Sequence, residues 1–241
     1  MTAFGRPHRH FRATDSTNAR ARELALGGAG EGTVVTADEQ SAGRGRQGRS
    51  WFAPAGTALL YSALLRPLGQ RPLLPLAVPL AVCEAAEALA PAECRVKWPN
   101  DVWISGRKLA GVLIESRAGE DGFAVIGVGL NVAVPAEAFP PELAGSAVSL
   151  GPGASAGPTV GEALSALNEA LGRWVDTPDD RVLAEFRARD ALSGSRVAWE
   201  EGEGVAAGID DSGHLMVDAT SGQRVTLGAG EVHLAAPDSR P

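Results

Sequence analysis

Residues 43–51 (GRGRQGRSW) place three arginines and three glycines within seven positions. Glycine lets the backbone come close to a ligand and exposes its N–H donors. Arginine adds fixed positive charge and a forked set of donors that fits carboxylate and phosphate oxygens. The segment is therefore suited to binding a small, multiply charged anion, although its composition is equally typical of a flexible, solvated basic loop.

Three further segments carry related chemistry. Residues 97–101 (KWPND) combine an ammonium, an amide and a carboxylate beside a proline, and residues 107–111 (RKLAG) add a second ammonium at the start of a predicted strand. Residues 127–131 (GVGLN) end another predicted strand with glycines and an amide. Each segment alone is also consistent with a turn, a surface lysine or ordinary packing. Together they fit a site that activates a carboxylate with ATP, because Arg, Lys and Mg²⁺ would offset the negative charges that this reaction brings together.

Several other kinds of site are excluded by the motifs that the sequence lacks. There is no Gly-x4-Gly-Lys-Ser/Thr, Gly-x-Ser-x-Gly or His-Glu-x-x-His pattern, and the four histidines lie outside the segments above. The chain has 22 basic residues, of which only Lys97 and Lys108 are lysine. The Arg- and Ala-rich composition accounts for most of this scarcity. We expect that the two retained lysines are needed for their ammonium groups.

The composition is that of an ordinary globular enzyme. The chain has 241 residues, 44% of them hydrophobic, and a net charge of −7, which is opposite in sign to that of most general nucleic-acid binders. Cys83 and Cys94 lack metal-ligand spacing, so we expect reduced thiols in a cytoplasmic protein. The N-terminus lacks the apolar segment of a signal peptide. Prolines and glutamates interrupt the apolar stretch 73–90, which predicts a buried helix rather than a membrane span.

The elements that must position these segments follow from hydrophobic periodicity. Helices are predicted over residues 19–26, 76–90, 162–174 and 181–189. Strands are predicted over residues 33–37, 59–65, 95–98, 102–104, 109–116 and 123–132, the last four as an antiparallel meander, and residues 135–158 as a long loop. Five short strands, at 197–199, 205–209, 215–217, 225–227 and 232–234, predict a small β-barrel. We therefore divide the chain into domains 1–190 and 191–241.

The motifs resemble those of biotin–protein ligases and occur in the same order, beginning with residues 15–18 (DSTN). The similarity runs from about residue 13 to residue 235. It implies an α/β (α+β) fold: a mixed, largely antiparallel sheet with helices, like that of class II aminoacyl-tRNA synthetases, plus a small C-terminal SH3-like barrel. Gln47 departs from the arginine that many members carry at this point of the loop.

The resemblance implies an ATP-dependent ligase that forms biotinyl-5′-AMP and then transfers biotin to a lysine of a biotin carboxyl carrier domain of acetyl-CoA or a related carboxylase. Its substrates would be biotin and ATP, with Mg²⁺. The implied catalytic residues are Lys108, Arg46 and Asp101. The implied biotin-binding residues are Ser16, Thr17, Asn18, Gln40, Arg44, Gly45, Arg46 and Lys108. The implied ATP and adenylate residues are Arg46, Arg49, Trp51, Asn100, Lys108 and Asn131. Asp101 would lie near the reacting amine or the metal, and the metal ligands stay unknown.

Several alternatives remain at this point. A lipoate–protein ligase or octanoyl-transferase-like enzyme has similar chemistry, but the arginine loop and KWPND favour biotin. A DNA-binding regulator is disfavoured because few residues precede Asp15, too few for a winged-helix domain, and the chain is acidic. We therefore expect a monofunctional ligase, without DNA or membrane partners, that is a monomer or weak homodimer. A β-barrel interaction protein is a third alternative. The barrel could cover the nucleotide or dock the acceptor.

Overall fold

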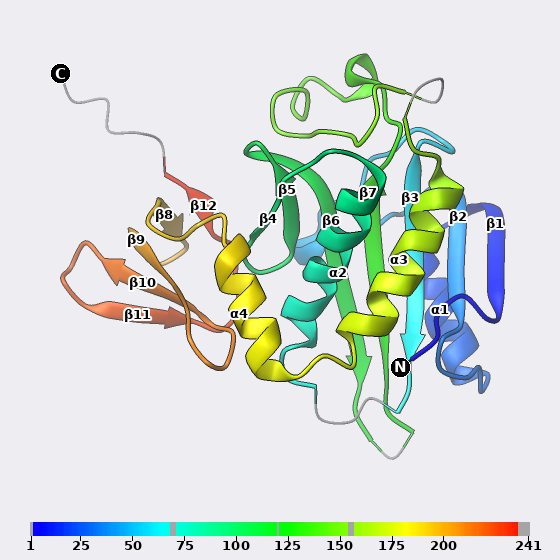
Figure 1. Ribbon diagram of the computed structural model, residues 1–241, viewed down its shortest axis with the longest axis horizontal. Helices are drawn as coiled ribbons and strands as arrows, with labels where there is room; N and C mark the ends of the chain where they lie inside the picture. Colours follow the sequence, from blue (N-terminus) through cyan, green and yellow to red (C-terminus); the bar gives the residue numbers. More distant parts are fainter. Residues whose placement is uncertain (1, 68–70, 120, 154–156, 236–241) are drawn as a thin grey trace.

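The computed structural model describes residues 2–67, 71–119, 121–153 and 157–235, and within them the chain forms two β-sheets and four α-helices (Figure 1). The first sheet contains β1 (His8–Thr14), β2 (Val34–Gln40), β3 (Ala58–Leu65), β4 (Cys94–Lys97), β5 (Asp101–Ile104), β6 (Arg107–Arg117) and β7 (Phe123–Asn131). The second contains β8 (Arg196–Trp199), β9 (Gly202–Ile209), β10 (Leu215–Ala219), β11 (Arg224–Leu227) and β12 (His233–Leu234). The helices are α1 (Thr17–Leu26), α2 (Leu74–Leu89), α3 (Val160–Trp174) and α4 (Asp179–Arg189), and the short 3₁₀ turns are η1 (Arg46–Gly48) and η2 (Ala136–Ala138).

The first sheet has the strand order β1-β2-β3-β7-β6-β5-β4. Strands β4 to β7 pair antiparallel with their sequence neighbours, which confirms the predicted meander. Strand β3 lies between β2 and β7 and is antiparallel to both, whereas β1 and β2 are parallel. The predicted fold class, a mixed and largely antiparallel sheet with helices, is confirmed.

The two faces of the first sheet have different roles, because side chains along a strand point alternately to opposite faces. In β7 the even-numbered residues from 124 to 130 belong to the main apolar core, together with α2 and α3. The odd-numbered Phe123 and Val125 pack in a second cluster with residues of α1. Gly127 and Gly129 lie on this same second face. Because they have no side chains, they leave open space above the sheet, whereas side chains fill the rest of that face of the strand.

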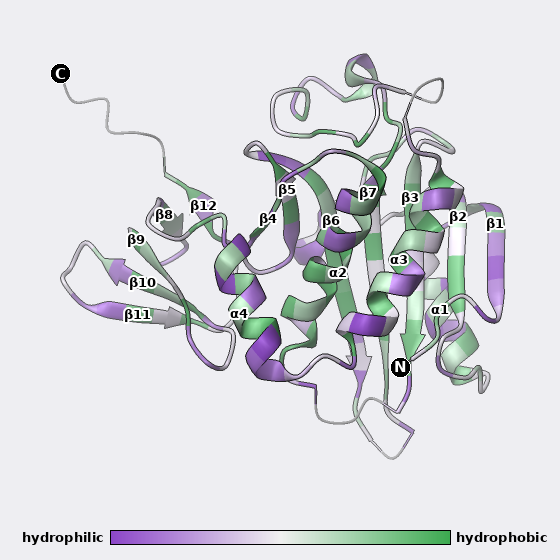
Figure 2. Ribbon diagram, in the orientation of Figure 1, coloured by the Kyte–Doolittle hydropathy of each residue, from purple (hydrophilic) through white to green (hydrophobic). Residues whose placement is uncertain are grey.

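The hydropathy of each strand matches how deeply it is buried. All eight residues of β3 are buried, since the strand lies between β2 and β7 with apolar clusters on both faces. Figure 2 shows β3 and α2 mainly in the hydrophobic colours and the edge strand β1 mainly in the hydrophilic ones. Helix α2 begins two residues before the predicted start, because Pro75 is tolerated in the first turn of a helix.

The second sheet has the order β11-β10-β9-β8-β12, so the five predicted short strands are confirmed as one antiparallel sheet. Its apolar residues, such as Val197 and Val217, join the same core cluster as α2 and α4. Trp98 Nε1 also donates a hydrogen bond to the carbonyl oxygen of Gly213, at 3.0 Å. The second sheet is therefore packed against the first part of the chain. The division into domains at residue 190 stays a prediction, and residues 236–241 of its second domain lie outside the described residues.

Strand β1 is the element that the sequence did not predict. Its sequence, HRHFRAT, lacks apolar alternation, and most of its side chains are exposed at the sheet edge. The strand forms because its backbone pairs with the buried β2, a contact that no local pattern announces. In the described part of the predicted loop 135–158, η2 is the one named element, and Ala147 forms an isolated bridge with Lys108. Among the described residues, no helix is both long and apolar enough to cross a membrane.

Candidate functional site

A cavity of about 410 Å³ lies over the glycine-containing ends of β6 and β7. Every residue that the sequence predicts for the site lines this cavity: Ser16, Thr17, Asn18, Gln40, Arg44, Gly45, Arg46, Arg49, Trp51, Asn100, Asp101, Lys108 and Asn131. These residues come from segments far apart in the chain. The structure therefore brings the predicted residues together, while their individual roles remain predictions.

Three glycines form the floor of the cavity. Gly111 of β6 is the register partner of Gly129 in β7. A Cβ atom on Gly129 would lie 2.5 Å from Trp51 Cε2, and one on Gly127 would lie 2.3 Å from Asn18 Oδ1. Both distances are shorter than any real contact, so only glycine lets the indole and the amide lie against the sheet. The predicted GVGLN segment thus positions two other predicted residues.

The beginning of α1 forms one wall of the cavity. The backbone N and the Oγ1 of Thr17 both donate to Gln40 Oε1, at 2.7 and 3.1 Å. The buried Ser62 of β3 places its Oγ 2.8 Å from Thr17 Oγ1 and 2.6 Å from Asn18 Oδ1. Because Gln40 uses its oxygen on Thr17, its amide nitrogen is left as a donor toward a ligand.

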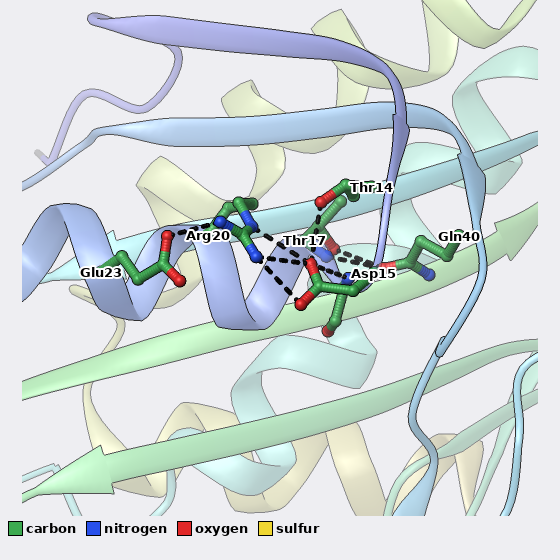
Figure 3. Close-up of polar contacts among 7 residues, drawn as sticks. Thr14, Asp15, Thr17, Arg20, Glu23 and Gln40 are labelled. Atoms are coloured by element: carbon green, nitrogen blue, oxygen red, sulfur yellow. Dashed lines mark hydrogen bonds and ion pairs between the residues drawn. The ribbon is translucent and has the colours of Figure 1, made fainter.

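An ion pair fixes the turn that leads into α1 (Figure 3). Asp15 Oδ1 accepts hydrogen bonds from Arg20 Nε at 3.1 Å and from the backbone N of Ser16 at 2.7 Å. The Arg20 guanidinium, followed by the Ser16 N–H, holds the pKa of Asp15 well below its usual value. Asp15 stays ionised at neutral pH and keeps residues 16–18 at the cavity wall.

Asn18 is oriented from the opposite side by two charged residues. Its Nδ2 donates to Glu115 Oε2 of β6 at 2.8 Å, and Glu115 in turn forms an ion pair with Arg22 of α1. The donor contact fixes the amide so that its oxygen faces Ser62. Ser62, Glu115 and Arg22 were not predicted, because their contact with the site depends on strand pairing rather than on neighbouring residues.

The glycine–arginine segment is a small hairpin over the cavity. Arg44 and Ser50 form an antiparallel bridge, and Gly45 N donates to the Arg49 carbonyl at 2.6 Å. At the tip, Gln47 and Gly48 have φ of 55° and 75°, the left-handed region that suits a turn. Arg49 forms an ion pair of 2.6 Å with Glu231, which lies just before β12. We call residues 42–50 the flap.

The two lysines lie beside the flap. Lys108 Nζ lies 2.7 Å from Asp101 Oδ1 and 5.8 Å from the centre of the Trp51 ring. Backbone hydrogen bonds from Lys108 N to Ser146 and from Val148 N to Lys108 fix its position on β6. The flap and the ammonium of Lys108 thus face the same cavity, as the predicted chemistry requires.

Lys97 is half-buried, as Lys108 is. Its Nζ is 5.5 Å from the centre of the Trp103 ring, a cation–π distance. Burial lowers the pKa of Lys97, the negative charge of Asp101 opposes that shift, and the positive charge of Lys108 adds to it. Lys97 therefore gives up its proton more easily than an exposed lysine.

Three buried polar atoms at the cavity have no hydrogen-bond partner among the described residues: Trp51 Nε1, Trp103 Nε1 and Asn131 Oδ1. Asn131 donates through Nδ2 to the Val148 carbonyl at 3.0 Å, which turns its oxygen away from that carbonyl. Buried polar groups are almost always paired in native proteins. These three atoms are fully covered in this geometry, so a ligand in the cavity would pair with them only after the surrounding side chains move.

The lining is strongly cationic. Its positive residues are Arg44, Arg46, Arg49 and Lys108, and its only acidic residue in the described part of the chain is Asp101. No group of three or more His, Cys, Asp or Glu residues suited to a metal occurs in that part of the chain. The cavity therefore favours an anion with apolar portions, and any metal there would need ligands from the anion itself.

Comparisons with known proteins agree with this geometry. Residues 10–131 match the model of the biotin/lipoate A/B protein ligase family. The biotin–[acetyl-CoA-carboxylase] ligase of Mycobacterium tuberculosis is 38% identical, over 91% of this chain and 85% of its own length. The bifunctional ligase/repressor BirA of Bacillus spizizenii is 36% identical, over 86% of this chain and 68% of its own length. Among solved structures, the biotin protein ligase from Aquifex aeolicus in complex with biotin and ATP superposes with a TM-score of 0.81 at 25% identity, over 95% of this chain and 99% of that one.

Proposed function

The chain belongs to the biotin/lipoate A/B protein ligase family, and from that premise we propose that it attaches biotin to a lysine of a biotin carboxyl carrier domain, at the cost of ATP. One observation carries this proposal. The arginine flap, Lys108 and the beginning of α1 face one cavity of about 410 Å³. The cations of the flap and of Lys108, together with the hydroxyl and amide groups of residues 16–18 and Gln40, match a carboxylate joined to a polar ring.

The first step joins biotin to AMP. A carboxylate oxygen of biotin attacks the α-phosphorus of ATP, a new O–P bond forms, and pyrophosphate leaves. The negative charge that develops on the phosphate and on the departing pyrophosphate requires fixed cations. Lys108 and the flap residues Arg46 and Arg49 supply them, and Lys108 contacts the biotin carboxylate and the α-phosphate together.

The other end of the cavity suits the ureido ring of biotin. The amide nitrogen of Gln40 is free to donate to the ureido oxygen, since its oxygen accepts from Thr17. Hydroxyl and amide oxygens of residues 16–18 accept hydrogen bonds from the ring N–H groups. The Trp51 ring, resting on Gly129, gives an apolar wall for the carbon skeleton. Asn100 and Asn131 lie beyond it and suit the adenylate, and the unpaired Asn131 Oδ1 suits an exocyclic amine.

The second step transfers biotin to protein. A neutral lysine amine of the carrier domain attacks the acyl carbon of the mixed anhydride. The N–C bond forms, the C–O bond to AMP breaks, AMP leaves with the electron pair, and the nitrogen loses one proton to solvent. The acyl-adenylate reacts with water if it is exposed, so a flap that closes over it protects the intermediate.

Mg²⁺ fits this site through a single protein carboxylate. Magnesium in nucleotide sites often binds one or two carboxylates plus substrate phosphates, and Asp101 is the acidic residue of the described lining. Asp101 would hold the ion, which supplies charge neutralisation for the phosphates. In the present geometry that carboxylate contacts Lys108 instead.

The test uses purified protein with biotin, ATP and a biotin-free carrier domain. We expect biotin-dependent exchange of labelled pyrophosphate into ATP, and ATP-dependent gain of one biotin on the carrier domain. Lipoate, offered in parallel, should give neither signal. Exchange with lipoate but not biotin would reject the proposal in favour of a lipoate ligase.

The proposal also covers the compartment of the enzyme and two properties that can be measured in solution, its oligomeric state first and its DNA binding second. We propose a cytoplasmic enzyme that is a monomer or weak homodimer and does not bind DNA. Sedimentation at several concentrations, with and without biotin and ATP, measures the first property. A gel-shift experiment with the regulatory DNA of its own biotin genes measures the second, and a specific shift would contradict the proposal.

A further inference from the structure

Two further hollows continue from the cavity toward the second sheet. A constriction of about 10 Å³ shares Arg46, Arg49, Asn100 and Asp101 with the cavity. On its far side it shares Gln47, Gly230 and Glu231 with a groove of about 390 Å³ on the second sheet, which we call the outer groove. Among the residues that line the outer groove are Trp199, Glu200, Glu201, Leu227, Glu231 and His233. One path therefore runs from the ligand cavity, past the flap, onto the second sheet.

The charge changes sign along this path. The outer groove carries Glu200, Glu201 and Glu231, and its described lining contains neither lysine nor arginine. Its one basic residue is His233, whose Nε2 lies 3.4 Å from Glu231. Its floor is apolar, because Trp199 and Leu227 are partly buried against the core. The cavity is suited to an anion, and the outer groove is suited to a cation with an apolar neighbour.

We propose that the outer groove docks the lysine-bearing turn of the acceptor domain and leads the lysine to the cavity. This inference rests on the proposed function, and it assigns the second sheet the role of receiving the protein substrate. The charges of the two substrates indicate that a lysine-bearing segment occupies the outer groove. The reaction joins an anionic substrate to a cationic side chain, and the path has a cationic end and an acidic end that meet at the flap.

The constriction prepares the lysine for attack. An ammonium group is attracted by Glu200 and Glu201 and then meets three cations, Arg46, Arg49 and Lys97, beside the two carboxylates of Asp101 and Glu231, so one net positive charge remains at the constriction. Nearby positive charges disfavour an ammonium and favour the neutral amine, which is the nucleophile. The amine forms its N–C bond to the acyl carbon, the C–O bond to AMP breaks, and the released proton passes to solvent.

The flap must move for the lysine to pass. A space of about 10 Å³ holds no more than one water molecule. The ion pair between Arg49 of the flap and Glu231 lies at this point, with a distance of 2.6 Å. Docking of the acceptor therefore requires these two side chains to separate, which couples acceptor entry to opening of the flap.

The experiment measures the two half-reactions separately in the full chain. The variant is the double substitution Glu200→Gln/Glu201→Gln, which keeps side-chain size and removes two charges. The matched control is Glu203→Gln, an exposed residue of β9 outside the groove lining, 3.7 Å from Arg196. Readouts are biotin-dependent pyrophosphate exchange, interception of the adenylate by hydroxylamine, and KM for a biotin-free carrier domain at two salt concentrations.

We expect the double variant to raise KM for the carrier domain about 3- to 10-fold at low salt, with the difference shrinking at high salt, as for exposed charges. Exchange and hydroxylamine interception should match the control. An unchanged KM with normal exchange would overturn the docking site and leave the ligase function intact. Absence of exchange in the unsubstituted protein would instead reject the function itself.

Discussion

Lys108 and Asp101 lie on neighbouring antiparallel strands, and their Nζ and Oδ1 atoms are 2.7 Å apart. A register shift between Val102 and Trp103 brings the two side chains together, since Lys108 pairs with Trp103 and Asp101 with Gly111. The ammonium is therefore held by a carboxylate until an anionic substrate competes for it. This exchange of partners gives the first two predictions.

Replacing Lys108 with alanine should slow adenylate formation by about 100-fold or more, because a cation that stabilises developing phosphate charge is lost. Biotin-dependent pyrophosphate exchange measures this step. Arg107→Ala is the control, since Arg107 is the exposed neighbour and does not line the cavity. A near-normal exchange rate in the Lys108 variant would remove Lys108 from the mechanism.

Replacing Asp101 with asparagine should raise the Mg²⁺ concentration needed for half-maximal adenylation, because the one carboxylate of the described lining is lost. Exchange rates over a Mg²⁺ series test this expectation. Asp121→Asn, in an exposed turn, is the control. An unchanged Mg²⁺ dependence combined with slower transfer to the carrier domain would move Asp101 from the metal to the reacting amine.

Replacing Gly129 with alanine should weaken biotin binding by about tenfold or more and lower stability by about 1–3 kcal/mol, as overpacking does. The added Cβ would lie 2.5 Å from Trp51 Cε2 and would lift the indole from the sheet. Titration calorimetry with biotin and thermal unfolding measure the two effects. Gly30→Ala is the matched control, because a Cβ there meets no atom within 4 Å. Equal affinity in both variants would separate Trp51 from the biotin wall.

Replacing Glu231 with glutamine should loosen the flap in the protein without ligand. The Arg49–Glu231 pair is partly exposed, so its loss should change stability by less than about 1 kcal/mol. Trypsin cleavage after the flap arginines should become faster and should slow again on adding biotin and ATP. Cleavage rates that match those of the unsubstituted protein would show that this ion pair does not hold the flap.

The fifth prediction concerns stability against pH at Asp190. Asp190 is 7% exposed, its Oδ1 accepts from Leu192 N at 2.8 Å, and its Oδ2 has no partner among the described residues. Burial raises the pKa of Asp190 above the usual 3.8, although the backbone hydrogen bonds oppose the shift. The folded state therefore binds this proton more tightly than the unfolded state, and the stability it contributes is lost as pH rises through the folded pKa.

Asp190→Asn should accordingly unfold at a higher temperature than the unsubstituted protein at pH 7. This advantage should disappear below pH 3.8, where the carboxyl group is protonated in both states. Thermal unfolding over a pH series measures it, with Asp121→Asn as the exposed control. A difference that is constant over pH would mean that the asparagine acts through its shape and not its charge.

Many of the residues that line the cavity could be named from the sequence because most of these occur in short local motifs, while their roles stay predictions. In KWPND and in RKLAG, the reactive residues lie within five positions of one another. KWPND joins β4 to β5, and RKLAG begins β6. The elements of the meander were also predicted, since β6 and β7 carry long apolar runs and β4 alternates apolar and charged residues. A local sequence pattern is sufficient to predict structure wherever strands pair with their neighbours in the sequence.

The remaining parts depend on contacts between distant residues. Strand β1 has polar side chains and exists through its pairing with β2. Ser62 and Glu115 reach the site only because β3 and β6 lie on either side of β7. The Arg49–Glu231 pair joins residues from opposite ends of the chain. Nothing in the neighbouring residues distinguishes these polar side chains from ordinary surface ones.

The position of both lysines at the cavity has a practical consequence for mapping this protein. Lys97 and Lys108 are the chain's two side-chain amines, and neither lies on an outer surface remote from the cavity. Apart from the terminal α-amine, amine-directed cross-linkers and N-hydroxysuccinimide dyes will therefore label only Lys97 and Lys108, beside the reactive centre. Cross-linking mass spectrometry of a complex will need carboxylate-directed reagents, for which Glu200 and Glu201 are accessible handles.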